Sequence, residues 1–298
     1  IKILKFISCK FAVGKRVQEL ELLDIMLEHK DDLMSRLEKV LYKKYGMNLD
    51  EESKASIIRN MTNQFVEARY RKNFKECVFI KSSKEGEYEI ASGFADVLNN
   101  RAFYSMVKEV TEFGIRRYEI GYSTRYKDTD FTLYQKYTYE DVCRILKWKE
   151  NMNSLIIGGY YYNEENKTLP VFVNYDKADD AIAYEDRFVS PDELIALSKH
   201  PRTVDSPDAD HIYKRTVNDQ DNQIYLFVRK NKDDKEAQEF YFLGEVEAEG
   251  EPEPIKMTTK QGKKDNAFEI DYHLDVPLRE DILEYIVGDN NEDDKSSG

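Results

Sequence analysis

The sequence has few cysteines and no long apolar segment. Its 298 residues include only three cysteines, Cys9, Cys77 and Cys143. Because their number is odd and their spacing wide, we expect neither a disulfide framework nor a CxxC metal site. This cysteine usage favours a reducing, cytoplasmic setting. No apolar run approaches the roughly eighteen residues that a membrane span needs, and no signal peptide is recognisable, so we expect a soluble protein without a membrane partner.

Sequence motifs of the common catalytic sites are also missing. No GxxxxGK[ST] loop occurs, which excludes a P-loop ATPase site in this chain, and no HExxH, GxSxG or HxKxxxxD pattern occurs either. The histidines lie far apart in sequence and predict no metal centre; they are His29, His200, His211 and His273. We therefore expect no catalytic residue, no metal and no cofactor in this chain.

Carboxylates, by contrast, are abundant, and many of them cluster in polar stretches. These clusters are Asp179 with Asp180, the group of Asp205, Asp208 and Asp210, and Asp233 with Asp234. Solvated loop charge is the expected role of each cluster. A self-contained nuclease that uses a divalent metal would have only this abundance in its favour.

Charge is distributed unevenly along the chain. The formal net charge of −13 divides into +3 for residues 1–131 and −16 for residues 132–298. An acidic second half argues against indiscriminate nucleic-acid binding, because Lys and Arg that neutralise phosphates supply most of that affinity. Any nucleic-acid contact there has to come from a local basic patch and a shaped pocket. The chain length favours two domains, and the start at Ile1 leads us to expect a piece of a longer protein.

The first half has the apolar spacing of helices. Leucines and methionines recur every three or four residues in VQELELLDIMLEHKDDLMSRLEKVLYKKYGMN, which predicts one amphipathic helix or two that break near residues 30–32. A stop is expected at Gly46 and a new start at Asp50 or Ser53. Helical periodicity continues after a short pair of strands near residue 86. We expect residues 1–131 to form a mainly helical domain.

The second half changes in character. After a short helix in TYEDVCRILKWK come runs rich in β-branched and aromatic residues: SLIIGGYYY, LPVFVNY, QIYLFVRK, EFYFLGEV and AFEIDYHL. SPDELIALSKH reads as a helix, with Ser190 as cap, Pro191 at its first position and Glu193 closing a capping box. Residues 132–288 therefore predict an α+β domain with a small barrel or a strongly bent sheet. The acidic residues 289–298 predict a disordered tail.

Aromatic rings crowd around one predicted strand-turn-strand corner, GGYYYNEENKTLPVFVNY. Period-two alternation sends Tyr160 and Tyr162 to one face of their strand and Tyr161 to the other. On the second strand, Tyr175 and Phe172 take opposite faces. An aromatic strand is usually part of a core, but a simple two-layer core does not require rings on both faces.

This corner resembles the SRA domains, SET and RING associated modules that recognise 5-methylcytosine. YTYEDVCRILKW, LPVFVNYDKADD, YEDRFVSPDELIALSKHPRT, IYLFVRK, FYFLGEV and FEIDYHLDVPLREDILEYI also resemble, in this order, the C-terminal domain of a bacterial helicase family. Its members include ATP-dependent, modification-dependent type IV restriction enzymes of the SauUSI-like type, in which a phospholipase-D-like nuclease and a helicase precede a helical coupler and an SRA-like domain. The resemblance covers residues 132–288, and residues 1–131 take the coupler's position.

The resemblance implies a pocket for a cytosine that has been flipped out of the duplex. Unstacking a base costs a few kcal/mol, which aromatic stacking at roughly 1 to 3 kcal/mol per ring offsets. Tyr160 matches the aromatic position of the SRA Gly-Gly-Tyr segment, with Tyr162 beside it. Tyr175 or Phe172 matches the aromatic of the second strand.

Specificity for cytosine needs an acceptor for the exocyclic amine. SRA proteins keep an Asp three residues after the Tyr, where this chain has Asn163. An amide oxygen accepts a hydrogen bond but lacks the charge-assisted strength of a carboxylate. Asp176 or Asp179 could supply the carboxylate instead, and ordinary turn chemistry is the alternative for Asn163 and Asp176.

Phosphate contacts are expected from local cations. The candidates are Lys177, Lys199, His200, Arg202, Arg229 and Lys230. Each of them could equally be an exposed surface charge.

Two hypotheses follow for the chain. In the first, it is the non-catalytic recognition end of a restriction enzyme: it binds 5-methylcytosine or 5-hydroxymethylcytosine in double-stranded DNA by base flipping and couples this to helicase and nuclease domains outside the chain. In the alternative, the acidic domain is a protein-interaction module that docks on its own helicase and regulates it.

Overall fold

The computed structural model describes residues 1–176, 186–231 and 238–288, without the side chains of Asp176 and Asn231. Unit 1 comprises residues 1–135 and 139–152, and unit 2 comprises residues 136–138 and 153–298. The tail expected to be disordered, residues 289–298, lies outside the described residues. In the part of the chain that the structure describes, no helix is both long and apolar enough to cross a membrane.

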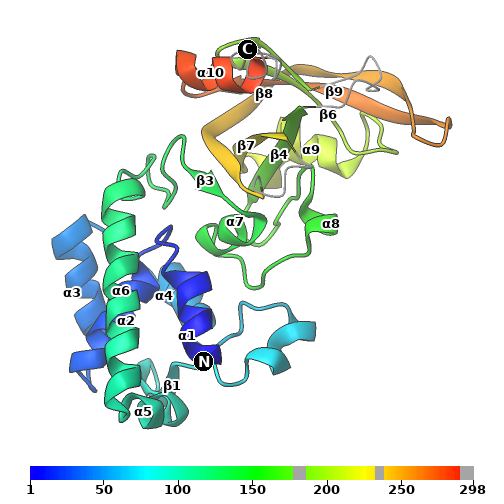
Figure 1. Ribbon diagram of the computed structural model, residues 1–298. Helices are drawn as coiled ribbons and strands as arrows, with labels where there is room; N and C mark the ends of the chain where they lie inside the picture. The colour runs from blue at the N-terminus through cyan, green and yellow to red at the C-terminus, as the bar shows by residue number, and fades with distance from the viewer. Residues whose placement is uncertain (177–185, 232–237, 289–298) are drawn as a thin grey trace, which may run out of the picture. The chain divides into compact units, whose positions relative to one another are not determined.

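Unit 1 consists mainly of helices, which confirms the expectation for the first half (Figure 1). Its helical elements are α1 (Lys2–Phe6), the π-helix η1 (Ile7–Phe11), α2 (Gln18–Glu28), α3 (Leu33–Tyr45), α4 (Glu51–Met61), the 3₁₀ helix η2 (Ala68–Phe74), α5 (Ser92–Leu98), α6 (Arg101–Gly121) and α7 (Tyr139–Ile145). The predicted pair of strands is the hairpin of β1 (Ile80–Lys84) and β2 (Glu87–Ile90).

Local signals end and begin these helices where the sequence predicted. The break between α2 and α3 ends at Asp32, whose φ of 52° is left-handed, and α3 ends at Gly46 with φ 65°. The side chain of Asp50 caps α4 by accepting a hydrogen bond from Ser53 N at 2.7 Å.

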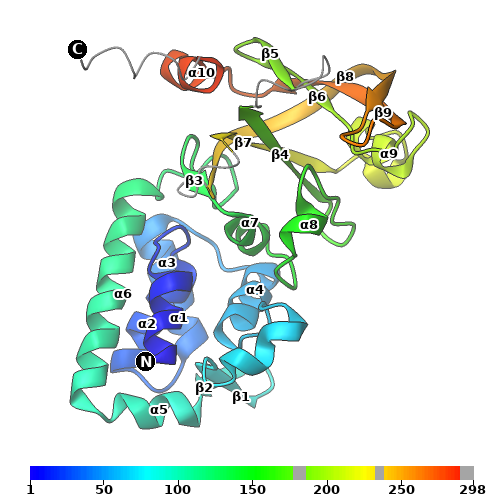
Figure 2. The same cartoon turned by 45° about the vertical axis from the view of Figure 1, so that its right-hand side comes forward.

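Helix α6 packs closely against α2 and the start of the chain (Figure 2). At Gly114 of α6, an added Cβ would lie 2.8 Å from both Ala12 Cα and Leu20 Cδ2. Real Cβ atoms do not approach other atoms so closely, so glycine is required at this crossing. Leu20 is fully buried there, as part of the apolar core of unit 1.

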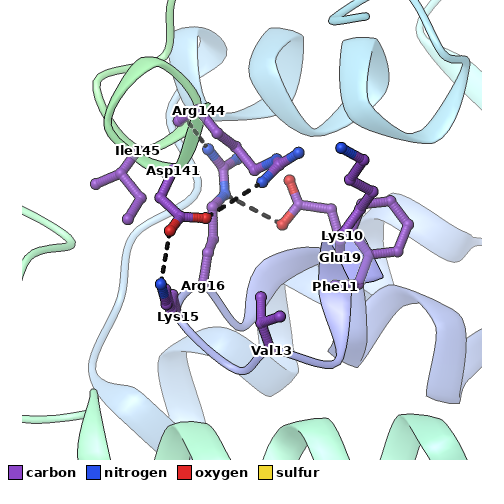
Figure 3. A pocket seen from close by; sticks show the side chains of 9 residues that line it. All are labelled: Lys10, Phe11, Val13, Lys15, Arg16, Glu19, Asp141, Arg144 and Ile145. Carbon is purple, nitrogen blue, oxygen red and sulfur yellow. Dashed lines mark hydrogen bonds and ion pairs between the residues drawn. The ribbon is translucent and has the colours of Figure 1, made fainter. Parts of the chain in front are cut away.

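Helix α7 belongs to unit 1, although the sequence placed its segment in the second domain. Buried charges hold it there (Figure 3). Lys15 Nζ lies 2.7 Å from Asp141 Oδ2, and Arg16 Nη1 donates to the carbonyl oxygen of Arg144 at 2.8 Å. These partners lie more than a hundred residues apart in the sequence, so no local pattern could predict the attachment.

A second carboxylate completes this group of charges. Glu19 Oε2 lies 3.1 Å from Arg16 Nε, and Glu19 Oε1 accepts a hydrogen bond from Asn60 at 2.7 Å. Glu19 is 1% exposed and Arg16 is 4% exposed. Beside them is a cavity of about 10 Å³, room for about one water. We call Lys15, Arg16, Glu19, Asp141 and Arg144 the Arg16 cluster.

Unit 2 is an α+β unit built on one mixed sheet, which confirms the expected class of the second half. Its strands are β3 (Lys136–Tyr137), β4 (Thr168–Asp176), β5 (Arg187–Ser190), β6 (Glu193–Leu197), β7 (Gln223–Asn231), β8 (Phe240–Thr258) and β9 (Lys264–Leu274). Its helices are α8 (Ser154–Ile157), α9 (Pro207–Tyr213), the 3₁₀ helix η3 (Val217–Asp219) and α10 (Glu280–Val287).

The sheet is ordered β4-β7-β8-β9-β6-β5, with β3 also pairing with β8. β4 and β7 run parallel, and the other neighbours run antiparallel. The two end strands of this order meet through side chains: the rings of Tyr175 in β4 and Phe188 in β5 lie 5.6 Å apart. Phe188 N also donates to the Tyr175 hydroxyl at 3.1 Å. The sheet is therefore curled, as the prediction of a strongly bent sheet required.

Two segments differ from the expectation. Residues 154–157, predicted as part of a strand, form α8, because Asn153 caps the turn by accepting from Leu155 N at 2.8 Å. Residues 190–200, predicted as a helix, comprise the end of β5, the turn of the hairpin, β6 and the first residues after it. β6 pairs with β9 and buries Leu194 and Ala196 alternately. This long-range pairing outweighs the local capping signals at Ser190.

Candidate nucleic-acid interface

Tyr160 lies where the chain leaves α8 and begins to pair with β4. Phe172 N donates to Gly159 O at 2.7 Å, and Tyr160 forms an isolated bridge with Val171. Gly159 has a φ of +83°, which side chains rarely adopt, and a Cβ there would lie 3.5 Å from Lys199 Cε. The Tyr160 ring is turned into unit 2 and is 5% exposed.

Two polar groups hold the Tyr160 hydroxyl. It donates a hydrogen bond to Asp208 Oδ2 and accepts one from Lys199 N at 3.1 Å. Asp208 belongs to α9, so segments far apart in the sequence meet here. Burial is the main cause that raises the pKa of Tyr160, and the hydrogen bond to Asp208 raises it further. This hydroxyl therefore keeps its proton.

Two cationic side chains lie next to Tyr160 and Asp208. Arg202 Nε lies 3.2 Å from Asp208 Oδ2, and Lys199 Nζ lies 5.2 Å from the centroid of the Tyr160 ring. The side chain of Arg202 is 41% exposed and that of Asp208 is 15% exposed. Burial is the main cause that lowers the pKa of Lys199, and the positive charge of Arg202 lowers it further. The Lys199 ammonium is therefore less well solvated here than in water.

One oxygen of Asp208 has no donor among the described residues. Asp208 Oδ1 is a buried atom that accepts no hydrogen bond from the described part of the chain. The buried hydroxyl of Tyr272 likewise has no hydrogen-bond partner among the described residues. Tyr272 is fully buried. Its burial is the main cause that raises the pKa of its hydroxyl, and the electrostatic effect of Tyr160 raises this pKa further. A buried acceptor without a donor is costly, so an N–H group that reached Asp208 Oδ1 would be stabilised. We call Tyr160, Lys199, Arg202 and Asp208 the Tyr160 corner.

Tyr162 is part of a separate stack. Its ring lies 3.9 Å from that of His211, and its hydroxyl donates to Asn222 Oδ1 at 2.9 Å. His211 Nδ1 is in turn 2.8 Å from Asp219 Oδ1. Burial alone would raise the pKa of Asp219, but hydrogen bonds from Thr216, His211 and Asn222 lower it. One face of Tyr162 is thus already occupied.

The other predicted pocket residues have partners of their own. Phe172 is 3% exposed, with its ring 5.2 Å from Phe227 and 5.1 Å from Phe240, so it belongs to the core rather than to a pocket. Tyr175 packs on Phe188 instead of Tyr160. Asn163 Oδ1 accepts hydrogen bonds from Glu165 N and Asn166 N at 3.1 and 3.3 Å, which is ordinary turn chemistry. The Asp176 side chain, Lys177 and Asp179 lie outside the described residues.

Truncating Phe172 tests its place in the core. Phe172→Ala is expected to lower the free energy of unfolding of unit 2 by about 3 to 5 kcal/mol, since it removes a buried ring and leaves a cavity. Urea unfolding measures this change. Val189→Ala, at a side chain that is 51% exposed, is the control and should change the stability by less than about 0.5 kcal/mol. A Phe172→Ala variant that is as stable as the control would contradict the core assignment.

The predicted phosphate-binding cations divide into two groups. Lys199 and Arg202 meet in the Tyr160 corner, and His200 Nδ1 lies 3.2 Å from Asp265 Oδ2 on the adjoining strand β9. Arg229 lies over the Phe240 ring, 4.3 Å from its centroid. Lys230 donates to the carbonyl oxygen of Gly288. Arg229 and Lys230 are therefore engaged with the sheet and with the end of α10.

The structure also brings together residues that the sequence did not connect. Lys256, Lys260, Lys263 and Lys264 are all exposed around the turn of the β8–β9 hairpin. Beside it lies a hollow of about 220 Å³ whose lining includes Arg202, Val204, Lys256 and Asn266. The sequence feature that could have indicated this basic group is residues 256–264, which contain four lysines and no acidic residue.

A group of possible metal ligands lies on another part of the sheet. Ligand atoms of Glu193, Asp271 and His273 lie within 4.8 Å of one another. Burial, and then the Asp271 carboxylate, raises the pKa of Glu193. His273 Nε2 is 3.5 Å from Asp271 Oδ1 and 3.4 Å from Glu249 Oε2, and we assign no metal to this group.

Solved structures similar to the chain come from modification-dependent restriction enzymes. They include the "DNA modification-dependent restriction endonuclease AspBHI" (16% identity, TM-score 0.29, 41% of this chain and 35% of that chain). Another is the "Sulfur binding domain and SRA domain of ScoMcrA complexed with phosphorothioated DNA" (10% identity, TM-score 0.34, 94% and 91%). A third is the "Type IV phosphorothioation-dependent restriction endonuclease ScoMcrA" (12% identity, TM-score 0.34, 92% and 63%).

The chain spans about a third of AspBHI and less than two thirds of the ScoMcrA endonuclease. All three TM-scores are below 0.5, so no site residue is transferred from these structures. No curated protein matches the chain. The family model described as "Domain of unknown function (DUF8090)" matches residues 1–120. The model described as "Domain of unknown function (DUF3427)" matches residues 131–286, more than half of the chain, and the chain therefore belongs to this family.

Proposed function

We propose that unit 2 is an SRA-like DNA-recognition module that reads a modified cytosine at the Tyr160 corner. The observation that carries the proposal is Asp208 Oδ1, a buried carboxylate oxygen without a described donor, beside an aromatic ring and two cations. The exocyclic amine of cytosine is a donor of the kind this oxygen lacks. Asp208 thus takes the role that the sequence assigned to Asn163, Asp176 or Asp179.

Base flipping explains how a base would reach so buried a carboxylate. A cytosine within the stacked duplex presents its edges only to the grooves, whereas a flipped base offers every edge to a pocket. Lys199 now lies over the Tyr160 ring, and Arg202 pairs with Asp208. In the proposal, the entering base displaces both side chains, which then bind the phosphates next to it. For Lys199, whose pKa burial lowers, this move regains favourable interactions for the charge.

The proposal extends to the rest of the chain. Unit 1 is the coupler that relays binding to helicase and nuclease domains outside the chain, as the sequence resemblance implies. The chain itself is then the non-catalytic recognition end of an ATP-dependent, modification-dependent type IV restriction enzyme. The Arg16 cluster supports a relay, because it fixes α7 in unit 1 immediately before the chain enters unit 2 at Asn153.

Binding to matched duplexes tests the proposal. We expect the chain to bind a duplex with one 5-methylcytosine at least roughly tenfold more tightly than the same duplex with cytosine, which corresponds to about 1.4 kcal/mol. Fluorescence anisotropy measures both affinities, and a 5-hydroxymethylcytosine duplex shows whether the larger group is tolerated. A fluorescent base analogue next to the modified position reports whether the base leaves the stack. Equal affinity for all three duplexes would contradict the proposal.

The alternative function has one observation in its favour. β8 carries a row of glutamates, Glu245, Glu247, Glu249, Glu251 and Glu253. Such a row would suit an acidic module that docks on a basic surface of its own helicase. Failure to bind any duplex, together with binding to the helicase core, would favour this alternative.

A further inference from the structure

The sign of the charge reverses along the β8–β9 hairpin. The glutamate row ends at Glu253, and residues 256–264 contain four lysines and no acid. Unit 2 is strongly acidic as a whole, so a basic stretch of this kind is a local exception. This stretch is a local basic patch, which an acidic half of the chain needs if it is to bind nucleic acid.

The lysines lie where the hairpin becomes a free two-stranded ribbon. Ser198 N donates to Phe268 O at 2.9 Å and Arg202 N donates to Asn266 O at 2.8 Å, so residues 198–202 cover the edge of β9 up to Asn266. Beyond Asn266, no described strand pairs with either edge of the ribbon. The hairpin projects past the rest of the sheet of unit 2 (Figure 1).

The charges at this tip have few partners of opposite sign. Lys260 and Lys264 pair with no acidic group in the described part of the chain. Lys263 is 78% exposed, and its Nζ lies 3.8 Å from Asp265 Oδ1. Lys256 donates to the Asn266 side chain and lines the hollow that Arg202 also lines. Four like charges gathered in this way repel one another, and a polyanion relieves the repulsion.

We propose that this basic ribbon tip, residues 256–266, enters the major groove of duplex DNA and binds phosphates on its walls. The inference rests on the proposed function in taking DNA as the partner. The three pairs from Lys256↔Asn266 to Thr258↔Lys264 span about 10 Å at roughly 3.4 Å per residue. The major groove of B-DNA is about 12 Å wide and admits a two-stranded β-ribbon.

The chemistry of the tip fits backbone contact rather than base reading. Lysine binds phosphate as a point charge, and such contacts carry no sequence information. The tip therefore supplies affinity and salt dependence, whereas the Tyr160 corner supplies discrimination. Arg202 connects the two sites, because it pairs with Asp208 and also lines the hollow behind the ribbon.

The triple variant Lys260→Gln, Lys263→Gln and Lys264→Gln tests the ribbon. We expect the slope of log affinity against log salt to become shallower by roughly three, about one per lysine. We also expect affinity to fall roughly tenfold or more at ~0.15 M salt, equally for modified and unmodified duplexes. Fluorescence anisotropy at several salt concentrations measures both. The matched control carries Lys39→Gln, Lys43→Gln and Lys72→Gln at exposed positions of unit 1, which change the net charge equally.

The outcomes separate this inference from the proposed function. An unchanged salt slope in the triple variant, or an equal loss in the control, overturns the ribbon inference only. A shallower slope with no preference for modified DNA supports the ribbon and overturns the modified-cytosine proposal. A wild-type chain that binds no duplex at low salt overturns both. A triple variant that loses self-association, with its DNA affinity intact, would assign the tip to the glutamate row of a second copy and also overturn the inference.

Discussion

Asp208→Asn is expected to weaken binding to a duplex with 5-methylcytosine by roughly 10- to 100-fold. Binding to unmodified duplex should be nearly unchanged, because a base that stays stacked does not reach this carboxylate. The reason for the loss is the arrangement around the carboxylate. The Tyr160 hydroxyl donates to Oδ2, so the oxygen of an asparagine amide takes that place. The amide NH₂ then replaces Oδ1 and faces the amine of the cytosine as a second donor. A hydrogen bond to a charged group contributes about 1.5 to 3 kcal/mol, which corresponds to this loss.

The neighbouring carboxylate provides the control for Asp208. Asp205 is exposed and lies just before α9, so Asp205→Asn changes the net charge equally without touching the Tyr160 corner. Anisotropy titrations with both duplexes give the ratio of affinities for each variant. Thermal unfolding shows whether Asp208→Asn keeps its fold. If a folded Asp208→Asn variant discriminates as well as Asp205→Asn, Asp208 does not read the base.

Local sequence rules predicted much of unit 1 because its helices end at local features. The stop at Gly46 depends on its own backbone conformation, and the start after Asp50 depends on a hydrogen bond to a residue three positions away. The attachment of α7 was not predictable in this way. It depends on contacts of Lys15 and Arg16 with residues far along the chain. The predicted boundary after residue 131 therefore precedes a helix whose contacts are with unit 1.

The candidate site was only partly predictable for the same reason. The resemblance directed attention to the segments of Tyr160, Lys199 and Arg202, and the structure brings these three residues together. It also named Phe172, whose ring is in the core because β4 is paired with the buried strand β7. Asp208 was interpreted as solvated loop charge, since nothing in its local sequence indicates that α9 places it beside Tyr160.

Glu19→Ala in the Arg16 cluster is expected to lower the free energy of unfolding of unit 1 by about 3 to 5 kcal/mol. Breaking a buried ion pair at one partner leaves the other charge without compensation. Arg16 would keep its hydrogen bonds to Ser56 and to the Arg144 carbonyl but lose its buried carboxylate, and Asn60 would lose its acceptor. Urea unfolding gives the cost, and Glu38→Ala, at an exposed position, should cost less than about 0.5 kcal/mol.

A double variant distinguishes the charge from the packing. Arg16→Met with Glu19→Leu removes both ions at similar volume and should recover most of the stability, because apolar replacement of a whole buried pair is often neutral or better. Cys143 gives a local measurement, since it is fully buried in α7 and burial raises the pKa of its thiol to about 12. Glu19→Ala should speed its reaction with a thiol reagent, and the double variant should slow it again. A single variant that costs less than about 1 kcal/mol and leaves Cys143 protected would show that α7 is held by its apolar contacts rather than by the Arg16 cluster.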